Sequence, residues 1–468
     1  MKISGEGQNN KFQKASTSEV IRYSFGGLGS NIPFILMMTF LNYFYTDIMG
    51  ISALVVSGVM LVTRIFDAVT DPLMGILGDR TRTRWGRYRP WIIVGAPLLG
   101  LFTFLVFYAP ELSQGAKVVY VYITYILYST FSDFANIPYH SLTPVISQDP
   151  NQRNVIVSLK QGMGIIAQLI ITSFGLNIVE ACGGGRIGWA WFGALCGITL
   201  TVSFYICASS AKKYDNLSTL PEVNKGNNVK FSDQIKIIAG NRSLLSLLAS
   251  FFCLLLASSI SSAVNVYYFK YILNRMDLVT ITSLISILAS VAVIVIMPPL
   301  AKIFGKKRIY ITCDLISAVS LVMLCFKPNV TATMLCIGLG WFSFFSRFPS
   351  NLGWSMLPEC VDYSEWKFGI RGNSTITASL TFTNKLGTAL GGFLASFVMA
   401  LAGYVANVEP TTAVKNTIVF LRFGLPAVLT VVSAIAIILY NIDNEMIQRI
   451  RTELNRKASG EEITKETK

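Results

Sequence analysis

Long apolar segments recur along the whole chain, and each is about as long as the 20 residues that a helix needs to cross a bilayer. Twelve can be counted, and they are continuous rather than alternating in polarity, which favours helices over strands. The chain is 52% apolar and 14% charged, whereas soluble proteins are about 25% charged. These features exclude an ordinary soluble enzyme and predict an all-α membrane protein. The predicted spans are 19–48, 53–77, 91–109, 117–145, 155–180, 188–211, 243–272, 277–303, 308–326, 332–361, 373–402 and 414–440.

Basic residues are concentrated in a few of the segments between these spans. The segment 78–89 carries five arginines, and 302–308 carries three lysines and an arginine, whereas 48–53 and 403–413 carry neither residue type. Because Lys and Arg are enriched in cytoplasmic loops, we expect the basic segments and both termini to be cytoplasmic. The formal net charge of +14 is therefore interpreted as membrane orientation, and no nucleic-acid partner is expected.

A polar central segment divides the spans into six and six. Each half has a short basic turn after its second span, which indicates an internal repeat. Two six-helix halves around a central cavity are a common transporter architecture, although a membrane sensor or a membrane-embedded enzyme is also consistent with the pattern. The expected divisions are a cytoplasmic N-terminal segment 1–18, an N-terminal half 19–211, a cytoplasmic linker 212–242, a C-terminal half 243–440 and a cytoplasmic tail 441–468.

Charged residues inside the second span need a physical reason, since each costs about 2.5–3.5 kcal/mol to insert. Asp67 and Asp71 are four residues apart and so lie on one face of a helix, with Thr70 close by. Two carboxylates and a hydroxyl are suitable ligands for Na⁺, or for a proton if one carboxyl takes it up. A structural charge pair with Arg64 is the alternative, but it leaves one carboxylate unpaired.

The fourth span adds further polar groups at helical spacing. Asp133 and Asn136 are one turn apart, and Pro138 frees backbone carbonyls of the kind that line cavities. Asp133 is a candidate third cation ligand. His140 is the only histidine, so we interpret it as a hydrogen-bonding residue of a polar cavity, with plain packing as the alternative.

Candidate substrate contacts also appear in the second half. Lys385 lies inside the eleventh span beside Thr381, deep enough to need a counter-charge or a sugar hydroxyl, although it could also extend to the cytoplasmic surface. Trp354, in the tenth span, is a candidate stacking surface for a sugar ring.

Other kinds of chemistry find no support in the sequence. The chain has no phosphate-binding loop for ATP, one histidine, and eight cysteines without CxxC spacing. We therefore expect neither enzymatic activity nor a cofactor, and no metal beyond a coupling cation.

Several motifs resemble those of one transporter family. The string Asp67-Ala-Val-Thr-Asp-Pro-Leu-Met-Gly75 is followed by Asp79-Arg-Thr-Arg-Thr-Arg-Trp-Gly-Arg-Tyr-Arg-Pro-Trp91, and then by Asn136-Ile-Pro-Tyr139, Asp149-Pro150 and Val361-Asp-Tyr-Ser-Glu-Trp-Lys-Phe-Gly-Ile-Arg371. In this order they resemble the glycoside–pentoside–hexuronide:cation symporters, which include melibiose permease and the glucuronide and xyloside transporters. The resemblance extends from about residue 19 to 440.

The resemblance implies a major facilitator fold and inward transport of a sugar with Na⁺, H⁺ or Li⁺. It implies a cation site on Asp67, Thr70 and Asp71, with Asp133 at a position where small hydroxyl residues are more usual. This departure leaves the choice between Na⁺ and H⁺ open.

Substrate residues implied by the resemblance depart from melibiose permease. Asn31 and Asn136 replace acidic residues, Gln161 replaces an arginine, and Lys385 is retained, so a pentoside, another neutral glycoside or a hexuronide fits better than melibiose. His140, Trp354 and Thr381 complete the expected set of substrate contacts.

The expected mechanism is alternating access in a monomer in the bacterial cytoplasmic (inner) membrane. Arg153, Asp362 and Arg371, at the cytoplasmic helix ends, are the expected inward gate. An uncoupled facilitator or exchanger of the same fold, and a membrane protein that senses a sugar without transporting it, remain as alternatives.

Overall fold

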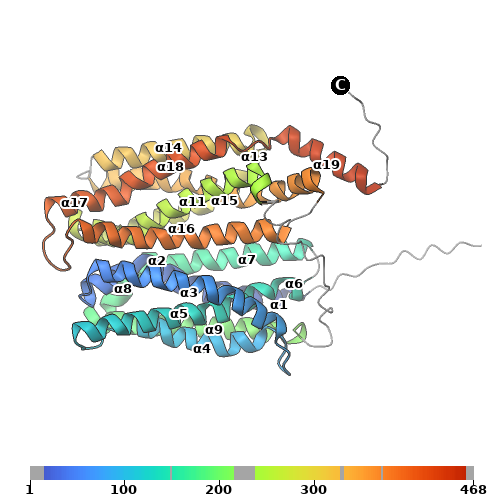
Figure 1. Cartoon of the computed structure of the whole chain (residues 1–468). Helices are drawn as coiled ribbons and strands as arrows, with labels where there is room; N and C mark the ends of the chain where they lie inside the picture. Colours follow the sequence, from blue (N-terminus) through green and yellow to red (C-terminus); the bar gives the residue numbers. More distant parts are fainter. Residues whose placement is uncertain (1–14, 148–149, 216–237, 327–330, 370–372, 460–468) are drawn as a thin grey trace, which may run out of the picture. The chain divides into compact units, whose positions relative to one another are not determined.

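The computed structural model describes residues 15–147, 150–215, 238–326, 331–369 and 373–459 (Figure 1). These residues are almost entirely helical, and the only β-structure among them is an isolated bridge between Thr83 and Gly86. The first half contains α1 (Thr17–Ser24), α2 (Gly26–Tyr43), η1 (Phe44–Ile48), α3 (Ala53–Arg80), α4 (Arg89–Val106), α5 (Gln114–Ser141), α6 (Thr143–Ile146), α7 (Pro150–Gln168), η2 (Leu169–Ser173), α8 (Phe174–Ala181), α9 (Gly185–Ser210) and η3 (Ala211–Lys213).

The second half repeats this series of long helices. Its elements are α11 (Arg242–Ala263), α12 (Asn265–Tyr267), η4 (Tyr268–Ile272), α13 (Asp277–Phe304), α14 (Lys306–Phe326), α15 (Ala332–Phe368), α16 (Asn373–Leu401), α17 (Thr412–Val419), η5 (Phe420–Gly424), α18 (Leu425–Ile438) and α19 (Asn444–Ser459).

All twelve predicted spans fall on helices, and nine of them are long and apolar enough to cross a membrane within the described part of the chain. The other three predicted spans lie on α3, α5 and α15, which have 28, 28 and 37 residues. These three helices carry most of the intramembrane charges predicted above.

π-Helical turns occur at the same place in the first and seventh spans. The turn η1 ends the first span and η4 ends the seventh. A π-turn inserts an extra residue into a helix and is often found at functional sites. Their matching positions agree with the internal repeat expected from the basic turns.

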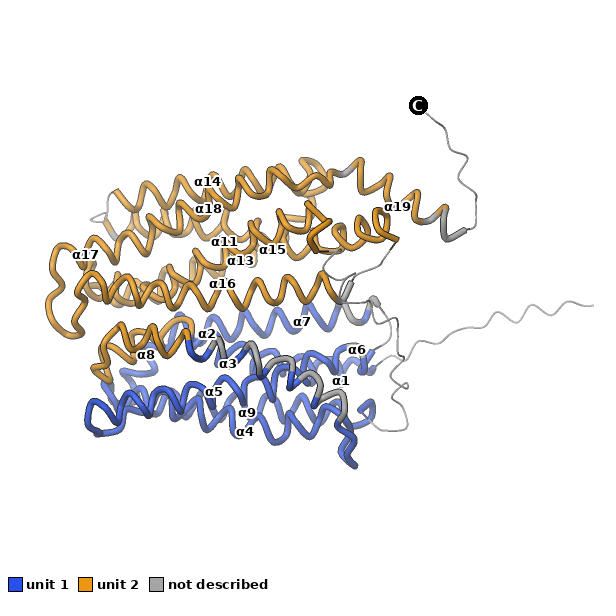
Figure 2. The backbone as a smooth tube through the Cα atoms, viewed as in Figure 1, with its two compact units in different colours: residues 1–37, 62–224 blue, residues 38–61, 225–468 orange. Residues whose placement is uncertain are grey.

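The chain forms two compact units, shown in Figure 2. Unit 1 comprises residues 1–37 and 62–224, and unit 2 comprises 38–61 and 225–468. The chain therefore passes between units within α2 and again within α3. The hairpin tip 38–61 belongs to unit 2, although the sequence suggested a division only at the central linker.

Unit 1 is held together by close helix crossings, of which α4 against α9 is the clearest. A Cβ atom built on Gly197 would lie 2.5 Å from the carbonyl oxygen of Gly100, so the two backbones are in direct contact. Gly26, Gly27 and Gly29 similarly leave no room for a side chain against α5, α7 and α9. Small residues at helix contacts are typical of membrane proteins, where close packing replaces the hydrophobic effect between helices.

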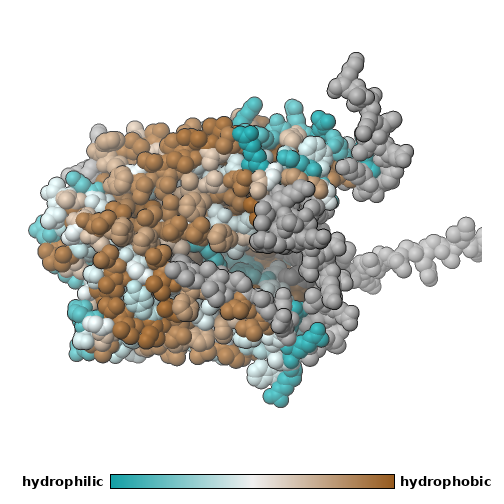
Figure 3. Space-filling model, in the orientation of Figure 1, coloured by the Kyte–Doolittle hydropathy of each residue, from teal (hydrophilic) through white to brown (hydrophobic). Residues whose placement is uncertain are grey.

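Unit 2 packs around α11, α14, α15 and α18. Its buried core includes Phe251, Tyr310, Met356 and Ile437. Apolar residues such as Leu288 and Val295 on α13 instead remain exposed, and Figure 3 shows apolar side chains over much of the visible helical surface. An apolar exterior over helices of this length is what a lipid environment requires.

Candidate functional site

The candidate cation site lies in unit 1, where α3 and α5 bring buried carboxylates next to hydroxyl groups. Asp67 is buried on α3, and its Oδ1 accepts a 2.5 Å hydrogen bond from Ser129 Oγ on α5. Thr70 Oγ1 lies 3.2 Å from Asp133 Oδ2 and 3.2 Å from the carbonyl oxygen of Phe66. Each helix thus supplies one hydroxyl group and one carboxylate: a hydroxyl of α5 contacts a carboxylate of α3, and a hydroxyl of α3 contacts a carboxylate of α5.

This geometry brings together three of the four predicted cation ligands. Asp67 and Thr70 come from α3, and Asp133, also buried, comes from α5. Asp71 lies in α3 by its backbone, but its side chain is outside the described part of the structure. Ser129, one helical turn before Asp133, was not predicted, although its spacing of four residues on the same span was a usable signal.

Carboxylate and hydroxyl oxygens from two helices are hard ligands. Such a set suits a small cation or a proton, and buried carboxylates need compensation by charge or hydrogen bonds. The arrangement can therefore couple the occupancy of a cation to the contact between α3 and α5.

The predicted substrate residues of unit 1 lie on α2, α5 and α7. Asn31 donates to the carbonyl oxygen of Gly27 at 2.8 Å and lies beside Gly164 of α7. Asn136 Nδ2 donates to the carbonyl oxygen of Ser132 at 3.0 Å, while its buried Oδ1 has no hydrogen-bond partner among the residues that the structure describes. That oxygen is a candidate acceptor for a sugar hydroxyl, since buried polar atoms are normally paired.

Lys160, the neighbour of the predicted Gln161, contacts one of the predicted substrate residues, His140. The Lys160 ammonium lies 4.0 Å from the ring centre of Tyr139 and 3.4 Å from His140 Nδ1. Since an ammonium only donates, this contact is a hydrogen bond in the tautomer of His140 in which Nδ1 is the acceptor. Gln161 itself is exposed on α7.

In unit 2 the predicted substrate residues lie on α15 and α16. Trp354 is 47% exposed and packs edge-to-face on Phe251, so one ring surface remains accessible. Thr381 is exposed and donates to the carbonyl oxygen of Thr377, and Lys385 is half-buried on the next turn. The substrate roles of these residues stay predictions.

The predicted gate residues are described only in part. Asp362 is half-buried on α15. The side chain of Arg153 on α7, and Arg371 as a whole, lie outside the described residues, so this gate also stays a prediction.

A second polar cluster, in unit 2, was missed by the sequence analysis. Asp47 of η1 is buried and forms an ion pair with Lys270 of η4, with a 2.6 Å contact between Oδ1 and Nζ. Both residues end predicted spans, and a charge of opposite sign at matching ends of the two repeats was the signal available.

No disulfide competes with these sites, because all eight cysteines are free.

Comparison with known proteins now identifies the group. The sequence model of a family described as MFS/sugar transport protein matches residues 22–444. The chain belongs to this family. The isoprimeverose transporter of Lactiplantibacillus pentosus is 31% identical over 436 residues, covering 91% of this chain and 89% of that protein. A putative glycoside/cation symporter of Escherichia coli strain K12, YagG, is 30% identical over 454 residues, covering 95% and 96%.

Solved structures confirm the fold. A D-xylose-proton symporter superposes with a TM-score of 0.64 at 15% identity, covering 90% of this chain and 96% of that one. At this identity the likeness establishes the major facilitator fold alone. Together with the family match, the protein is a multi-pass membrane protein of a sugar-transporter family, and the resemblance found in its motifs is confirmed.

Proposed function

We propose that the protein imports a sugar by symport with a monovalent cation, Na⁺ or H⁺, in an alternating-access cycle. The substrate class we favour is a neutral glycoside or pentoside, with a hexuronide as the remaining possibility. The proposed location is a bacterial cytoplasmic membrane, with both termini on the cytoplasmic side.

The paired hydroxyl–carboxylate contacts of Asp67 and Asp133 are the observation that carries the cation coupling. Two buried carboxylates that face hydroxyl groups across neighbouring helices supply the oxygen ligands that a small cation binds. The names of two relatives, a glycoside/cation symporter and an isoprimeverose transporter, support a cation and a glycoside as the cargo.

The proposed coupling is a linkage between the cation and the sugar. Cation binding at Asp67, Thr70 and Asp133 neutralises charge and fixes α5 against α3. Because α5 also carries Asn136 and His140, one and two turns further along, fixing this helix orients the sugar contacts. Each ligand then raises the affinity for the other by the same factor.

The test is uptake into proteoliposomes with an imposed Na⁺ or H⁺ gradient and a panel of a neutral glycoside, a pentoside and a hexuronide. We expect one sugar class to accumulate above equilibrium with one of the two cations. Equal equilibration without either gradient would instead establish an uncoupled facilitator, and binding without any flux would indicate a sensor.

A further inference from the structure

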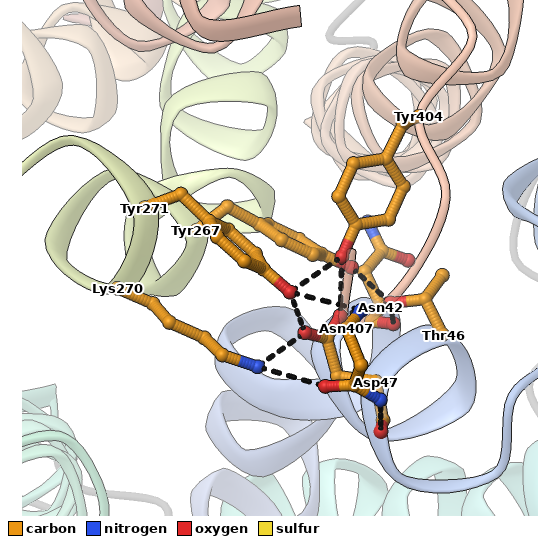
Figure 4. A network of polar contacts seen from close by, with 8 residues as sticks. All are labelled: Asn42, Thr46, Asp47, Tyr267, Lys270, Tyr271, Tyr404 and Asn407. Carbon is orange, nitrogen blue, oxygen red and sulfur yellow. Dashed lines mark hydrogen bonds and ion pairs between the residues drawn. The ribbon is translucent and has the colours of Figure 1, made fainter. Parts of the chain in front are cut away.

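The cluster around Asp47 contains eight residues of unit 2 from three distant stretches of chain (Figure 4). Asp47 Oδ1 accepts hydrogen bonds from Lys270 Nζ at 2.6 Å and from Tyr271 OH at 2.5 Å. Its Oδ2 accepts from Tyr404 OH at 2.6 Å and from Thr46 Oγ1 at 2.8 Å. Four donors therefore converge on one carboxylate.

Asn407 closes the cluster from the loop that follows α16. Its Nδ2 donates to the carbonyl oxygen of Asp47 at 2.6 Å, and its Oδ1 accepts from Lys270 Nζ at 3.2 Å. Asn407 has a φ of 59°, a left-handed conformation that asparagine tolerates better than most residues. The conformation of this loop thus places the side-chain amide of Asn407 within hydrogen-bond distance of both Asp47 and Lys270.

The charges balance within the cluster. The Asp47 side chain has no exposed surface, and the Lys270 side chain is 26% exposed. Burial also raises the pKa of the Tyr404 phenol, which keeps that group a hydrogen-bond donor at any physiological pH. A carboxylate with one cation and three hydroxyl donors is fully compensated.

The cluster lies at the membrane end opposite the basic turn of unit 2. The helix α13 begins five residues after η4 and runs its whole length to the turn at Lys306 and Lys307. Since basic turns face the cytoplasm, the cluster belongs to the extracellular end. It is also centred on the two π-turns, η1 and η4, that occupy matching positions in the two repeats.

Chain connectivity makes this position mechanically important. The hairpin tip 38–61 belongs to unit 2, but α2 before it and α3 after it continue into unit 1. The hairpin is thus covalently continuous with unit 1 on both sides, and within it the Asp47 carboxylate accepts hydrogen bonds from Lys270, Tyr271 and Tyr404 of unit 2.

We propose that the Asp47 cluster is an extracellular latch: it holds the first hairpin against the C-terminal unit and must open in each transport cycle. The proposal rests on the proposed function, because only a transporter needs the hairpin to be released. Lys270 and Tyr404 are its closing residues, and Asp47 is the acceptor that both share.

An ion pair is well suited to a latch that has to open. The free energy of removing two charges from water is nearly as large as the free energy of their attraction. A buried ion pair therefore adds little net stability but requires one geometry. When the latch opens, water solvates both charges and replaces the lost contacts. A purely apolar contact of the same area would have no such compensation on opening.

The experiment measures the extracellular opening directly, without sugar or cation. Spin labels are placed at Glu111→Cys in unit 1 and Glu409→Cys in unit 2, in a background without the native cysteines, and their distance distribution is measured by double electron–electron resonance. Both glutamates are largely exposed, at 91% and 89% of the side chain. We expect Asp47→Asn and Lys270→Met to raise the population of the longer distance by about tenfold.

Two further variants make the result specific. Tyr404→Phe removes one hydroxyl and no charge, so we expect a smaller shift in the same direction, and it serves if the charge variants do not fold. Arg275→Gln breaks the neighbouring exposed pair with Asp277 and should leave the distribution unchanged. Distance distributions that coincide with the parent in all latch variants would overturn the latch.

Failure of the latch and failure of the proposed function are separable. If no sugar accumulates in proteoliposomes but the latch variants shift the distances, the latch stands and the coupling is wrong. If coupled uptake is normal in the parent and the distances do not respond, the transporter stands and the cluster is a structural contact only.

Discussion

At the scale of single residues, the candidate site in unit 1 consists of two hydrogen bonds, each between a hydroxyl group and a carboxylate. Ser129 serves Asp67 and Thr70 lies against Asp133. The sequence grouped Asp67, Thr70 and Asp133 as candidate cation ligands because spacing along a helix fixes which residues share a face, and their role as ligands stays a prediction. It did not assign the partners, because these depend on how α3 and α5 are rotated against each other.

Removing one hydroxyl tests the cation site. We expect Thr70→Val to raise the cation concentration for half-maximal uptake about tenfold, about 1.4 kcal/mol, because the proposed site loses a hydroxyl oxygen ligand. Thr130→Val is the matched control, since Thr130 donates to the carbonyl oxygen of Ile126 within its own helix, α5. The measurement is the cation dependence of sugar uptake, and equal effects of both substitutions would contradict the assignment.

Asn136 gives a second test at this scale. Replacing it by leucine removes a buried acceptor without a partner in the described part of the chain, so we expect the melting temperature to be unchanged or higher. If Oδ1 receives a sugar hydroxyl, the same substitution weakens sugar binding by about tenfold or more. Calorimetric sugar binding and thermal unfolding of the purified variant separate the two effects, and unchanged affinity would remove Asn136 from the substrate site.

At the scale of helices, unit 1 is stabilised where the arginine-rich turn before α4 contacts Asp215. The sequence predicted that this segment is a turn, and that it is cytoplasmic, which stays a prediction; it did not indicate that Asp215 anchors the turn. This carboxylate is fully buried and accepts from the backbone N–H groups of Arg87, Tyr88 and Arg89, at the start of α4. The residue follows α9 in sequence and reaches α4 only through the fold.

The second basic turn is anchored in a related way. Lys307 of α14 donates to the carbonyl oxygens of Ile438 and Tyr440 at the end of α18, and Lys306 pairs with Glu359 at 2.6 Å. In each unit, then, the start of the third span is tied to the end of the sixth. The donors are backbone amides in one unit and lysines in the other.

Removing the Asp215 carboxylate should loosen the first of these turns. We expect Asp215→Ala to lower the free energy of unfolding by about 1–3 kcal/mol, because three buried N–H groups lose their acceptor, with Asp215→Asn intermediate. Glu111→Gln, at an exposed position, is the control and should have little effect. Thermal unfolding in detergent measures all three, and a wild-type melting temperature for Asp215→Ala would exclude this anchoring role.

The crossing of α4 and α9 makes a second prediction about elements. Gly197→Ala places a methyl group 2.5 Å from the Gly100 carbonyl oxygen, so the helices must separate, at a cost of about 1–3 kcal/mol. Gly115→Ala, where the new methyl group meets no atom within 4 Å, should be neutral or stabilising by up to about 1 kcal/mol. Similar melting temperatures for the two variants would mean that the crossing is not tight.

At the scale of the whole molecule, membrane orientation follows from the distribution of basic residues. We expect Glu409→Cys to react with a membrane-impermeant maleimide in intact cells, and Lys302→Cys to react only after permeabilisation, because the two positions lie at opposite ends of unit 2. Both side chains are exposed in this unit, so access is set by the membrane rather than by burial. The reverse labelling pattern would invert the topology and place the Asp47 latch on the cytoplasmic side.

The sequence by itself predicted the long helices, their membrane character and the grouping of Asp67, Thr70 and Asp133 on two spans as a candidate cation site, whose role stays a prediction. These properties depend on hydropathy, charge and helical spacing, which act over one or two turns of chain. Only the tertiary structure decided that residues 38–61 pack with the C-terminal unit, that Asp215 caps α4, and that Asp47, Lys270 and Tyr404 meet. Those contacts join residues more than 100 positions apart, and their partners are selected by helix rotation and packing, which no local pattern encodes.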